Sequence, residues 1–437
     1  MHTIISFGSR RWRRPSTRLP ALLLVLFAPA LAAQTIISGD PVPQLAAFDT
    51  ALVNLMNQHD ITQAEMAITW QGRLVLAHGY TRNRGPNDVG VQPVTRMRIA
   101  SNSKQITSIL VNRLIQDGAL SLNDTLSQFV DLTPLPGESA DPRLAKVTVR
   151  NLLEHLAGFG NYGIRDPMFA DPQIAAAVGT SLPIHQDDII RAMNGVALNS
   201  NPGTTFQYSN YGYLLLGRII EVASGMSYEA YAKSIFQPLG IHLMRLGHSR
   251  RSDSIGFETG YYSGIQRATV FDDSGTLVPY EYGAFNLENM DSHGGWIMSA
   301  VELVRIASNL DKPAAPTAVL NHASLARMLA RPQNYAGPYT PGDPYYASGW
   351  SVRDYGNGHY NTWHDGSLPG TTSYMARIQD GWDFVVILNR RAESGNACYS
   401  CEIDTMMWNV RQTISPSQWP THDLFPKMLD ILFIDGF

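Results

Sequence analysis

The 437-residue sequence contains only two cysteines, five lysines and no block of like charge. Two cysteines without a nearby pair of histidines do not indicate a zinc site. Beyond residue 33, no apolar run is long enough to cross a bilayer. The pattern Gly-x-Ser-x-Gly is absent, which excludes an α/β-hydrolase elbow as the source of a nucleophilic serine. The composition, 44% hydrophobic and 16% charged, is typical of a globular protein with a sizeable core.

The first 33 residues differ from the rest of the chain. An apolar run over residues 19–33 ends in small residues. It is preceded by five arginines: Arg10, Arg11, Arg13, Arg14 and Arg18. This order is typical of an export signal, so we expect residues 1–33 to be a signal peptide and the protein to be periplasmic or secreted. The alternative is a membrane anchor that is never cleaved.

The charge balance excludes one class of partner. Residues 1–33 carry five arginines and no acid, so the remainder has 28 basic and 37 acidic residues and a net charge of −9 with histidine neutral. Such a balance argues against nucleic acid. We expect a small-molecule or peptide substrate and no stable membrane span after signal cleavage.

Apolar periodicity places strands at both ends of the chain and helices in the middle. Strands are expected within 65–77 and over 347–355, 360–364, 371–378 and 382–388. Helices are expected over 46–59, 147–158, 187–198, 228–236, 300–310, 321–330 and 401–414, and after Ser101 and Asn210, whereas 166–183 has little period. The predicted fold is α/β (α+β), with an antiparallel sheet built from both chain ends, flanked by helices, and a large helical insertion. The predicted domain spans 45–395, with a sheet part at 45–117 and 290–395, a helical part at 118–289, and a helix and tail at 396–437.

Ser101 and Lys104 stand three residues apart where a polar turn leads into a helix. If Ser101 opens that helix, its hydroxyl and the Lys104 amine lie on one face. A partly desolvated lysine can lose its proton and activate a serine hydroxyl, and the helix N-terminus favours negative charge beside it. Ser101 could instead be a helix cap. Ser103 is a second candidate nucleophile, although its side chain would point away round the helix.

Tyr208 and Asn210 form a second candidate group. A phenol can relay a proton, and an amide can hold a substrate carbonyl or the lysine. Residues 355–357 repeat the Tyr-x-Asn spacing but lack the preceding Pro-Gly and the following helix, so we favour Tyr208.

The third group, His364-Asp365-Gly366-Ser367, lies on a late strand. A glycine at position 366 lets an extended substrate lie beside the strand. The backbone N–H that follows can point at an oxyanion.

Ser-x-x-Lys, Tyr-x-Asn and His-x-Gly, in this order, resemble the motifs of the serine β-lactamase and penicillin-binding superfamily. The chain is similar to the branch that contains class C β-lactamases, DD-peptidases and esterases, over about residues 45–395. Further stretches similar to that branch are 152–158, 202–217, 236–240 and 294–295. The resemblance implies a sheet domain combined with an all-helical domain.

The resemblance also implies a role for each candidate residue. Ser101 would be the acylated nucleophile, Lys104 its base or proton shuttle, and Tyr208 the group that assists the shuttle and protonates the leaving group. Asn210 would orient the substrate. His364 and Gly366 would lie on the strand beside which the substrate binds. The N–H groups of Ser101 and Ser367 would form the oxyanion hole. The superfamily needs no metal or nucleotide, so we expect no cofactor.

Two positions depart from the β-lactamase pattern. His364 stands where β-lactamases of this kind usually carry lysine, and resembles DD-peptidases and hydrolases of the branch. Asp365 in place of threonine adds negative charge where a substrate carboxylate often binds. Both changes argue against efficient penicillin hydrolysis. The hypothesis is therefore an esterase or D-amino-acid peptidase, with a true β-lactamase or a non-catalytic binder of cell-wall peptides as alternatives.

Two further features have competing interpretations. His155 is either a buried histidine bonded to backbone groups or a catalytic residue. Cys398 and Cys401 form either a local disulfide, as expected in an exported protein, or a redox-active pair.

Overall fold

The computed structural model describes residues 35–82, 90–160, 166–333, 340–393, 395 and 397–428. The predicted export signal, residues 1–33, lies outside the described residues. Within these described ranges, no helix has both the length and the apolar character needed to cross a membrane.

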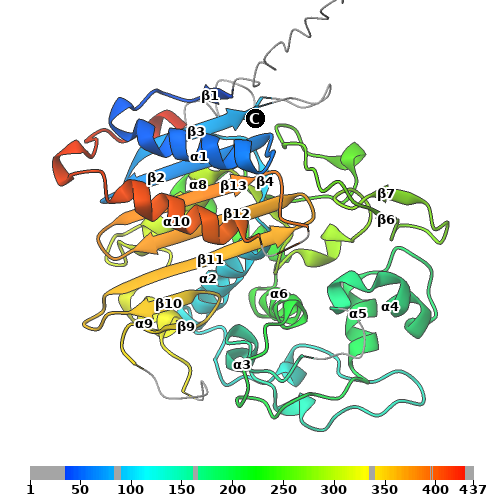
Figure 1. Ribbon diagram of the computed structural model, residues 1–437. Helices are drawn as coiled ribbons and strands as arrows, with labels where there is room; N and C mark the ends of the chain where they lie inside the picture. The colour runs from blue at the N-terminus through cyan, green and yellow to red at the C-terminus, as the bar shows by residue number, and fades with distance from the viewer. Residues whose placement is uncertain are drawn as a thin grey trace, which may run out of the picture. The chain divides into compact units, whose positions relative to one another are not determined.

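An eight-stranded antiparallel sheet forms the centre of the described chain (Figure 1). Its strands, in spatial order, are β1 (Ile36–Ser38), β3 (Arg73–Thr81), β2 (Gln63–Trp70), β13 (Trp382–Leu388), β12 (Thr371–Ile378), β11 (Tyr360–Leu368), β10 (Ser351–Asp354) and β9 (Pro344–Tyr346). The two chain ends meet where β13 pairs with β2, with Leu388 opposite Ala64. This confirms the predicted fold class.

The strands that bury both faces do so by alternation. On β13, Val385 and Ile387 pack into the cluster on one side of the sheet, while Phe384, Val386 and Leu388 pack into the cluster on the other. Side chains of a strand point alternately to opposite faces, so an unbroken apolar run is what a strand covered on both sides requires.

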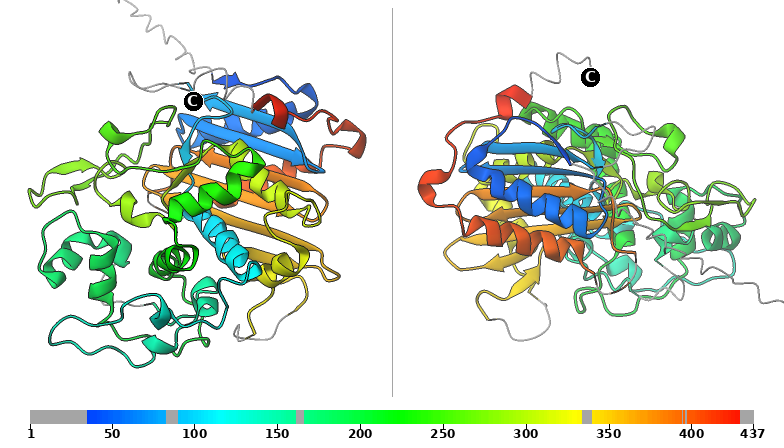
Figure 2. Two further views of the ribbon diagram at one scale, coloured as in Figure 1. Left: turned by 180° about the vertical axis from the view of Figure 1, so that it is seen from behind. Right: turned by 45° about the horizontal axis from the view of Figure 1, so that its top comes forward.

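Helices cover both faces of the sheet (Figures 1 and 2). One face, called here the outer face, carries α1 (Ala46–Gln58) and α10 (Tyr399–Arg411). The opposite, inner face carries α8 (Ala300–Leu310), and α2 (Ser103–Gln116) begins against it. The inner face is the one that adjoins the helical part of the chain.

The helical part lies between β4 (Met97–Arg98) and β8 (Trp296–Met298), which pair with each other and, through β8, with β5 (Arg245–Leu246). Its helices are α3 (Val149–Leu153), α4 (Asp171–Val178), α5 (Gln186–Met193), α6 (Asn210–Ser224) and α7 (Tyr228–Phe236), with a hairpin of β6 (Gln266–Ala268) and β7 (Leu277–Pro279). The helix α9 (His322–Leu329) follows α8 and contacts α2.

Four predicted ranges were wrong in extent. The strand expected over 347–355 is only β10, because residues 347–350 form the turn that joins it to β9. The helix expected over 187–198 ends at Met193.

The helix expected over 147–158 is only α3, because the backbone at His155 turns to a φ of 54°, which an α-helix does not accommodate. The segment 166–183, expected to be irregular, contains α4, which ends at Gly179 with a φ of 72°.

Candidate active site

Ser101 lies in a tight turn of 3-10 helix, Ala100–Asn102, directly in front of α2. It therefore precedes the α-helix instead of opening it. Ala100 has a φ of 47°, which is uncommon for a residue with a side chain. Such a conformation costs on the order of 1–3 kcal/mol and persists only where the surroundings hold it.

Ser373 on β12 holds this turn against the sheet. Its hydroxyl donates to the Ile99 carbonyl (2.6 Å) and accepts from the Asn102 amide (2.7 Å). All three groups are buried. The strained turn is thus fixed on its sheet side, and the Ser101 side chain remains directed at the pocket that it lines.

Lys104, one turn further on, is fully buried. Its Nζ atom lies 3.1 Å from Ser101 Oγ, 2.8 Å from Asn210 Oδ1 and 2.9 Å from the His293 carbonyl oxygen. Burial lowers its pKa to about 7, and the charges of Asp166 and Asp365 partly oppose that shift. Near neutral pH, a large fraction of the amine is therefore unprotonated.

Below its pKa, the Lys104 ammonium donates to all three oxygens, whereas the neutral amine has only two N–H groups. The His293 carbonyl and Asn210 Oδ1 can only accept hydrogen bonds, so they take its two N–H groups. The lone pair is then left for the Ser101 hydroxyl. This is the arrangement that a general base requires.

Asp166 fixes the orientation of Asn210. The Asn210 amide donates to Asp166 Oδ2 at 2.6 Å, and a carboxylate accepts hydrogen bonds. The amide oxygen of Asn210 therefore faces Lys104. In this structure Asn210 holds the lysine, one of the two tasks that the sequence suggests for it.

Tyr208 lies at the mouth of the pocket, immediately before α6. Its phenol has the Ser101 side chain as a hydrogen-bond partner, and Lys104 Nζ lies 4.8 Å from its ring centroid. Although Tyr208 is 43% exposed, the surrounding protein desolvates the phenol and raises its pKa above the ordinary value. Tyr208 is thus a neutral proton donor or relay at neutral pH.

His364 is buried on β11 and hydrogen-bonds at both ring nitrogens. Nδ1 donates to the backbone carbonyl of Asp365 (2.5 Å), so Nε2 accepts from the Tyr346 hydroxyl (3.0 Å). Burial lowers the pKa of His364 to about 4, and the imidazole is neutral near pH 7. It offers no positive charge to a substrate carboxylate.

The end of β11 presents an open edge to the pocket. β12 pairs with β11 as far as Leu368, whereas β10 pairs with it only from Tyr360 to Trp363. Residues 364–368 therefore have an unpaired side on which an extended substrate can lie. The turn between β9 and β10 ends beside α2, where a Cβ on Gly349 would lie 2.8 Å from the Lys104 carbonyl oxygen.

Gly366 brings this edge against Ser101. A Cβ on Gly366 would lie 2.4 Å from the Ile99 carbonyl oxygen and 3.0 Å from the Ser101 nitrogen. Only glycine permits that approach. Ser367 follows and lines the same pocket as Ser101, which puts the two residues predicted to supply oxyanion N–H groups on one pocket wall.

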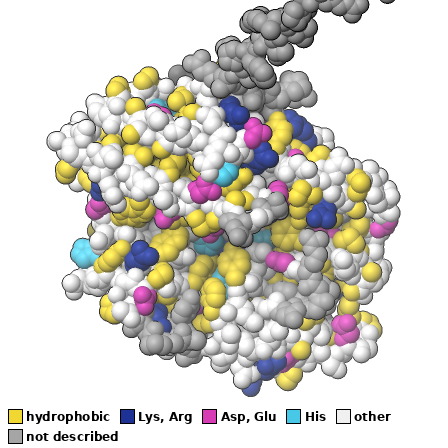
Figure 3. All heavy atoms as spheres, viewed as in Figure 1, with side chains coloured by type: hydrophobic (Ala, Val, Ile, Leu, Met, Phe, Trp, Pro, Cys, Tyr) yellow, Lys and Arg dark blue, Asp and Glu magenta, His cyan; other side chains and the backbone are white. Residues whose placement is uncertain are grey.

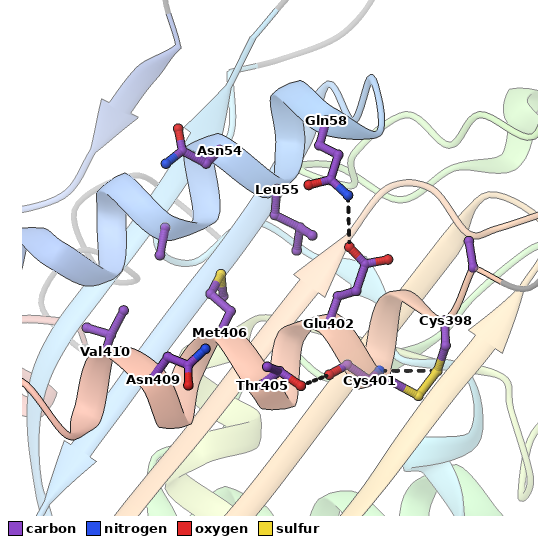
Figure 4. Close-up of a pocket in the computed structure, with 12 residues that line it drawn as sticks. Asn54, Leu55, Gln58, Cys398, Cys401, Glu402, Thr405, Met406, Asn409 and Val410 are labelled. Atoms are coloured by element: carbon purple, nitrogen blue, oxygen red, sulfur yellow. Dashed lines mark hydrogen bonds between the residues drawn. A yellow bond between two sulfur atoms is a disulfide. The ribbon is translucent and has the colours of Figure 1, made fainter.

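The pocket has a volume of about 360 Å³. It is lined by Ser101, Tyr208, Tyr346, Ser351, His364, Asp365 and Ser367. A larger cavity of about 630 Å³ lies elsewhere, between α1 and α10 on the outer face (Figure 4), and holds none of the predicted site residues. The structure thus brings all seven predicted residues, Ser101, Lys104, Tyr208, Asn210, His364, Gly366 and Ser367, to one place.

A family model described as Beta-lactamase matches residues 48–399. The chain belongs to the Beta-lactamase family.

Individual relatives of this Beta-lactamase family chain are distant. Protein flp of Staphylococcus aureus (strain COL) is 25% identical over 354 residues, which are 79% of this chain; they span 63% of that protein's length. Among solved structures, the octameric penicillin-binding protein homologue from Pyrococcus abyssi gives a TM-score of 0.61 at 23% identity, covering 86% of this chain and 78% of the other. The D-amino acid amidase from Ochrobactrum anthropi SV3 gives 0.62 at 22%, covering 86% and 99%. These structures show the same fold.

In this Beta-lactamase family chain, the structure distinguishes the competing interpretations of Ser103 and of His155. Ser103 is buried and its hydroxyl accepts a hydrogen bond from the backbone N–H of Trp296, so it does not face the pocket. His155 Nδ1 accepts the Ser209 N–H at 3.1 Å, which agrees with the backbone-bonded alternative. The centroid of its ring also lies 4.4 Å from that of the Tyr208 ring, so the two rings pack against each other.

Sequence reasoning missed Tyr346, Asp166 and Ser373. Tyr346 hydrogen-bonds His364, Asp166 orients Asn210, and Ser373 holds the turn that contains Ser101. Each acts only through a contact far away in the chain, so no local pattern marks it. Within the described ranges, no group of three or more His, Cys, Asp or Glu side chains could hold a metal ion.

Proposed function

We propose that this protein is an exported serine hydrolase that forms an acyl-enzyme on Ser101 with an ester or amide substrate. The observation that carries this proposal is the buried Lys104 amine, whose two N–H groups are taken by acceptors while its third position faces the Ser101 hydroxyl. An esterase or a D-amino-acid peptidase is the preferred type.

The residues suggest the following steps. Lys104 takes the proton of Ser101, and Oγ attacks the substrate carbonyl carbon. The N–H groups of Ser101 and Ser367 hold the oxyanion. Lys104 and Tyr208 return the proton to the leaving alcohol or amine, whose bond to the carbonyl carbon then breaks. Water, deprotonated by the same groups, releases the acid and restores the Ser101 hydroxyl.

The substrate class is supported by charge and by similar folds. A neutral His364 beside Asp365 disfavours the carboxylate of a penicillin, so a true β-lactamase ranks lower. D-amino acid amidase, a protein of similar fold, has been solved with D-phenylalanine and with L-phenylalanine amide. These amino acid ligands agree with an amide or ester substrate.

Labelling with a fluorophosphonate probe, followed by peptide mass spectrometry, tests the acyl-enzyme. We expect an adduct on Ser101 that is lost in Ser101→Ala and kept in the matched variant Ser103→Ala. An adduct on Ser103, or none on folded protein, would contradict the proposal. Rates with p-nitrophenyl esters, D-alanyl peptides and nitrocefin would then rank the three activities.

The non-catalytic alternative gives a different result. A binder of cell-wall peptides would hold its ligand equally well after Ser101→Ala and would release no product. Export is tested separately, because a mature protein from the periplasm or medium should begin near residue 34. An N-terminus that still contains residues 1–33 would argue for the uncleaved anchor.

A further inference from the structure

Asp365 occupies the rim of the same pocket as Ser101. Its two neighbours on β11, His364 and Gly366, are buried, whereas Asp365 itself is exposed. Side chains of a strand alternate between faces, so Asp365 is directed away from the interior that contains Lys104. Its carboxylate is therefore open to solvent and to a substrate.

Asp365 is the only acidic or basic side chain among the described lining residues, apart from the neutral His364. The remaining side chains of the wall carry hydroxyl groups: Ser101, Tyr208, Tyr346, Ser351 and Ser367. No lysine or arginine of the described chain forms an ion pair with Asp365, and Lys104 uses its amine on other partners. The pocket wall thus presents one uncompensated negative charge.

A contact from the outer face fixes this carboxylate. The Ser400 hydroxyl donates to Asp365 Oδ2 at 3.1 Å. Ser400 lies inside the short loop closed by the disulfide between Cys398 and Cys401, at the start of α10 (Figure 4). The Cys401 N–H donates to Cys398 Sγ at 3.2 Å. One carboxylate oxygen is held in this way, and Oδ1 accepts no hydrogen bond from a described residue.

The spacing along β11 sets the distance between the Asp365 charge and the oxyanion site at Ser367. Asp365 lies two residues before Ser367, and a strand advances about 3.3 Å per residue, so the two residues are about 7 Å apart. We propose that Asp365 is an anionic subsite that binds an ammonium group of the substrate within about 7 Å of the scissile carbonyl. The enzyme then favours cationic esters and amides over neutral ones and rejects those with a carboxylate there. This inference rests on the proposed acyl-enzyme function.

Isosteric substrate pairs test this subsite. Acetylcholine and 3,3-dimethylbutyl acetate differ by a charge on the leaving group, whereas D-alanine methyl ester and methyl isobutyrate differ by a charge on the acyl group. We expect kcat/KM to favour the cationic member of at least one pair, and Asp365→Asn to reduce that preference about three- to tenfold. The responding pair identifies the side of the carbonyl on which the ammonium group binds.

Two variants sharpen the measurement. Ser400→Ala should reduce the same ratio by less than Asp365→Asn, because the carboxylate remains but is no longer held. Asp404→Asn is the matched control, since Asp404 lies on α10, accepts the Tyr374 hydroxyl and does not line the pocket. Loss of the Asp365 charge also lowers the pKa of Lys104, because that charge raises it. This change affects both substrates of a pair equally. Added salt should weaken the wild-type preference.

The outcomes separate the two proposals. Equal kcat/KM within both pairs, or an unchanged ratio in Asp365→Asn, would overturn the subsite while a Ser101 adduct still supports the acyl-enzyme. Loss of the adduct itself would overturn the proposed function. Where turnover is too slow, the labelling rates of Ser101 with a phosphonyl choline and with its 3,3-dimethylbutyl analogue give the same ratio.

Discussion

The two faces of the sheet are built from different kinds of side chain. The outer face packs aromatic and aliphatic groups under α1 and α10. The ring centroid of Trp382 lies 6.5 Å from that of Phe48 and 4.7 Å from that of Phe384. The inner face meets α2 and α8 and buries polar groups as well, among them Lys104, His293 and Glu65. In the space-filling view, the charged side chains on the visible surface are interspersed and not collected in a block (Figure 3).

The candidate site lies on the inner face, away from the aromatic layer of the outer face. Burial of an apolar group is favourable, whereas a polar group must find a partner inside the protein or costs free energy. Glu65 illustrates this, because it accepts the first N–H of α8 and burial still raises the pKa of its carboxyl. The inner face accepts such costs next to the helical part. On the outer face the buried His78 likewise has a partner, Asp49 of α1, 2.7 Å from its Nδ1.

The largest expected effect is on the inner face. Ser101→Ala should reduce turnover by about 10⁴-fold or more, since it removes the proposed nucleophile. The melting temperature should change little because Ser101 is only partly buried. Hydrolysis rates together with circular dichroism check this, and a variant that keeps its activity would break the comparison.

Lys104→Met should reduce kcat/KM by about 10³-fold, the contribution of a well-placed general base. Methionine retains most of the side-chain volume but cannot take a proton. Steady-state kinetics measure the loss. Lys146→Met provides a control at an exposed lysine, and an equal loss there would point to a general effect.

On the outer face, Trp382→Ala should cost about 3–5 kcal/mol of unfolding free energy, because it removes a fully buried aromatic ring. Denaturant titration measures this cost. At a temperature where the variant is folded, the rate of Ser101 labelling should stay near that of the wild type. A selective loss of labelling would show that the two faces are coupled.

Removal of the Cys398–Cys401 disulfide should cost about 2 kcal/mol or less, since it closes a loop of only a few residues. The double variant Cys398→Ser with Cys401→Ser and the reduced wild type should agree in stability. A loss as large as that of Trp382→Ala would mean that this loop, and not the apolar layer, fixes α10.

The last prediction concerns pH. The folded pKa of Lys104 is lowered to about 7, so the neutral amine is the main form above that pH and disappears below it. We expect kcat/KM to rise with pH up to about 7 and to fall about tenfold for each unit below that. The pH profile of ester hydrolysis at constant ionic strength measures this, and a flat profile from pH 5 to 8 would contradict Lys104 as base.

Part of the fold could be predicted from local pattern alone. Helices α7 and α8 and strands β12 and β13 agree with the predicted ranges, because each has a clear period between strong turn signals. Where a single residue overrides the pattern, the prediction failed. At 147–158 the helical period continues past His155, but α3 ends at Leu153 and the backbone turns at His155, whose ring packs against Tyr208.

The same limit applies to the site. The three motifs identified Ser101, Tyr208 and His364, since each carries its own chemistry. The strain at Ala100 and the hydroxyl of Tyr346 could not be found in this way. They exist only because a turn, a sheet and a hairpin meet, and no stretch of sequence contains all three.

The hairpin of β9 and β10 carries Gly349 in its turn. That turn abuts the backbone of α2, β10 begins only at Ser351, and residues 364–368 of β11 are left unpaired on that side. A hairpin two residue pairs longer would lie along this gap and occupy it as a built-in pseudosubstrate. In the proposed hydrolase, access to Ser101 can thus be tuned through the length of one hairpin while Ser101, Lys104 and Tyr208 stay unchanged.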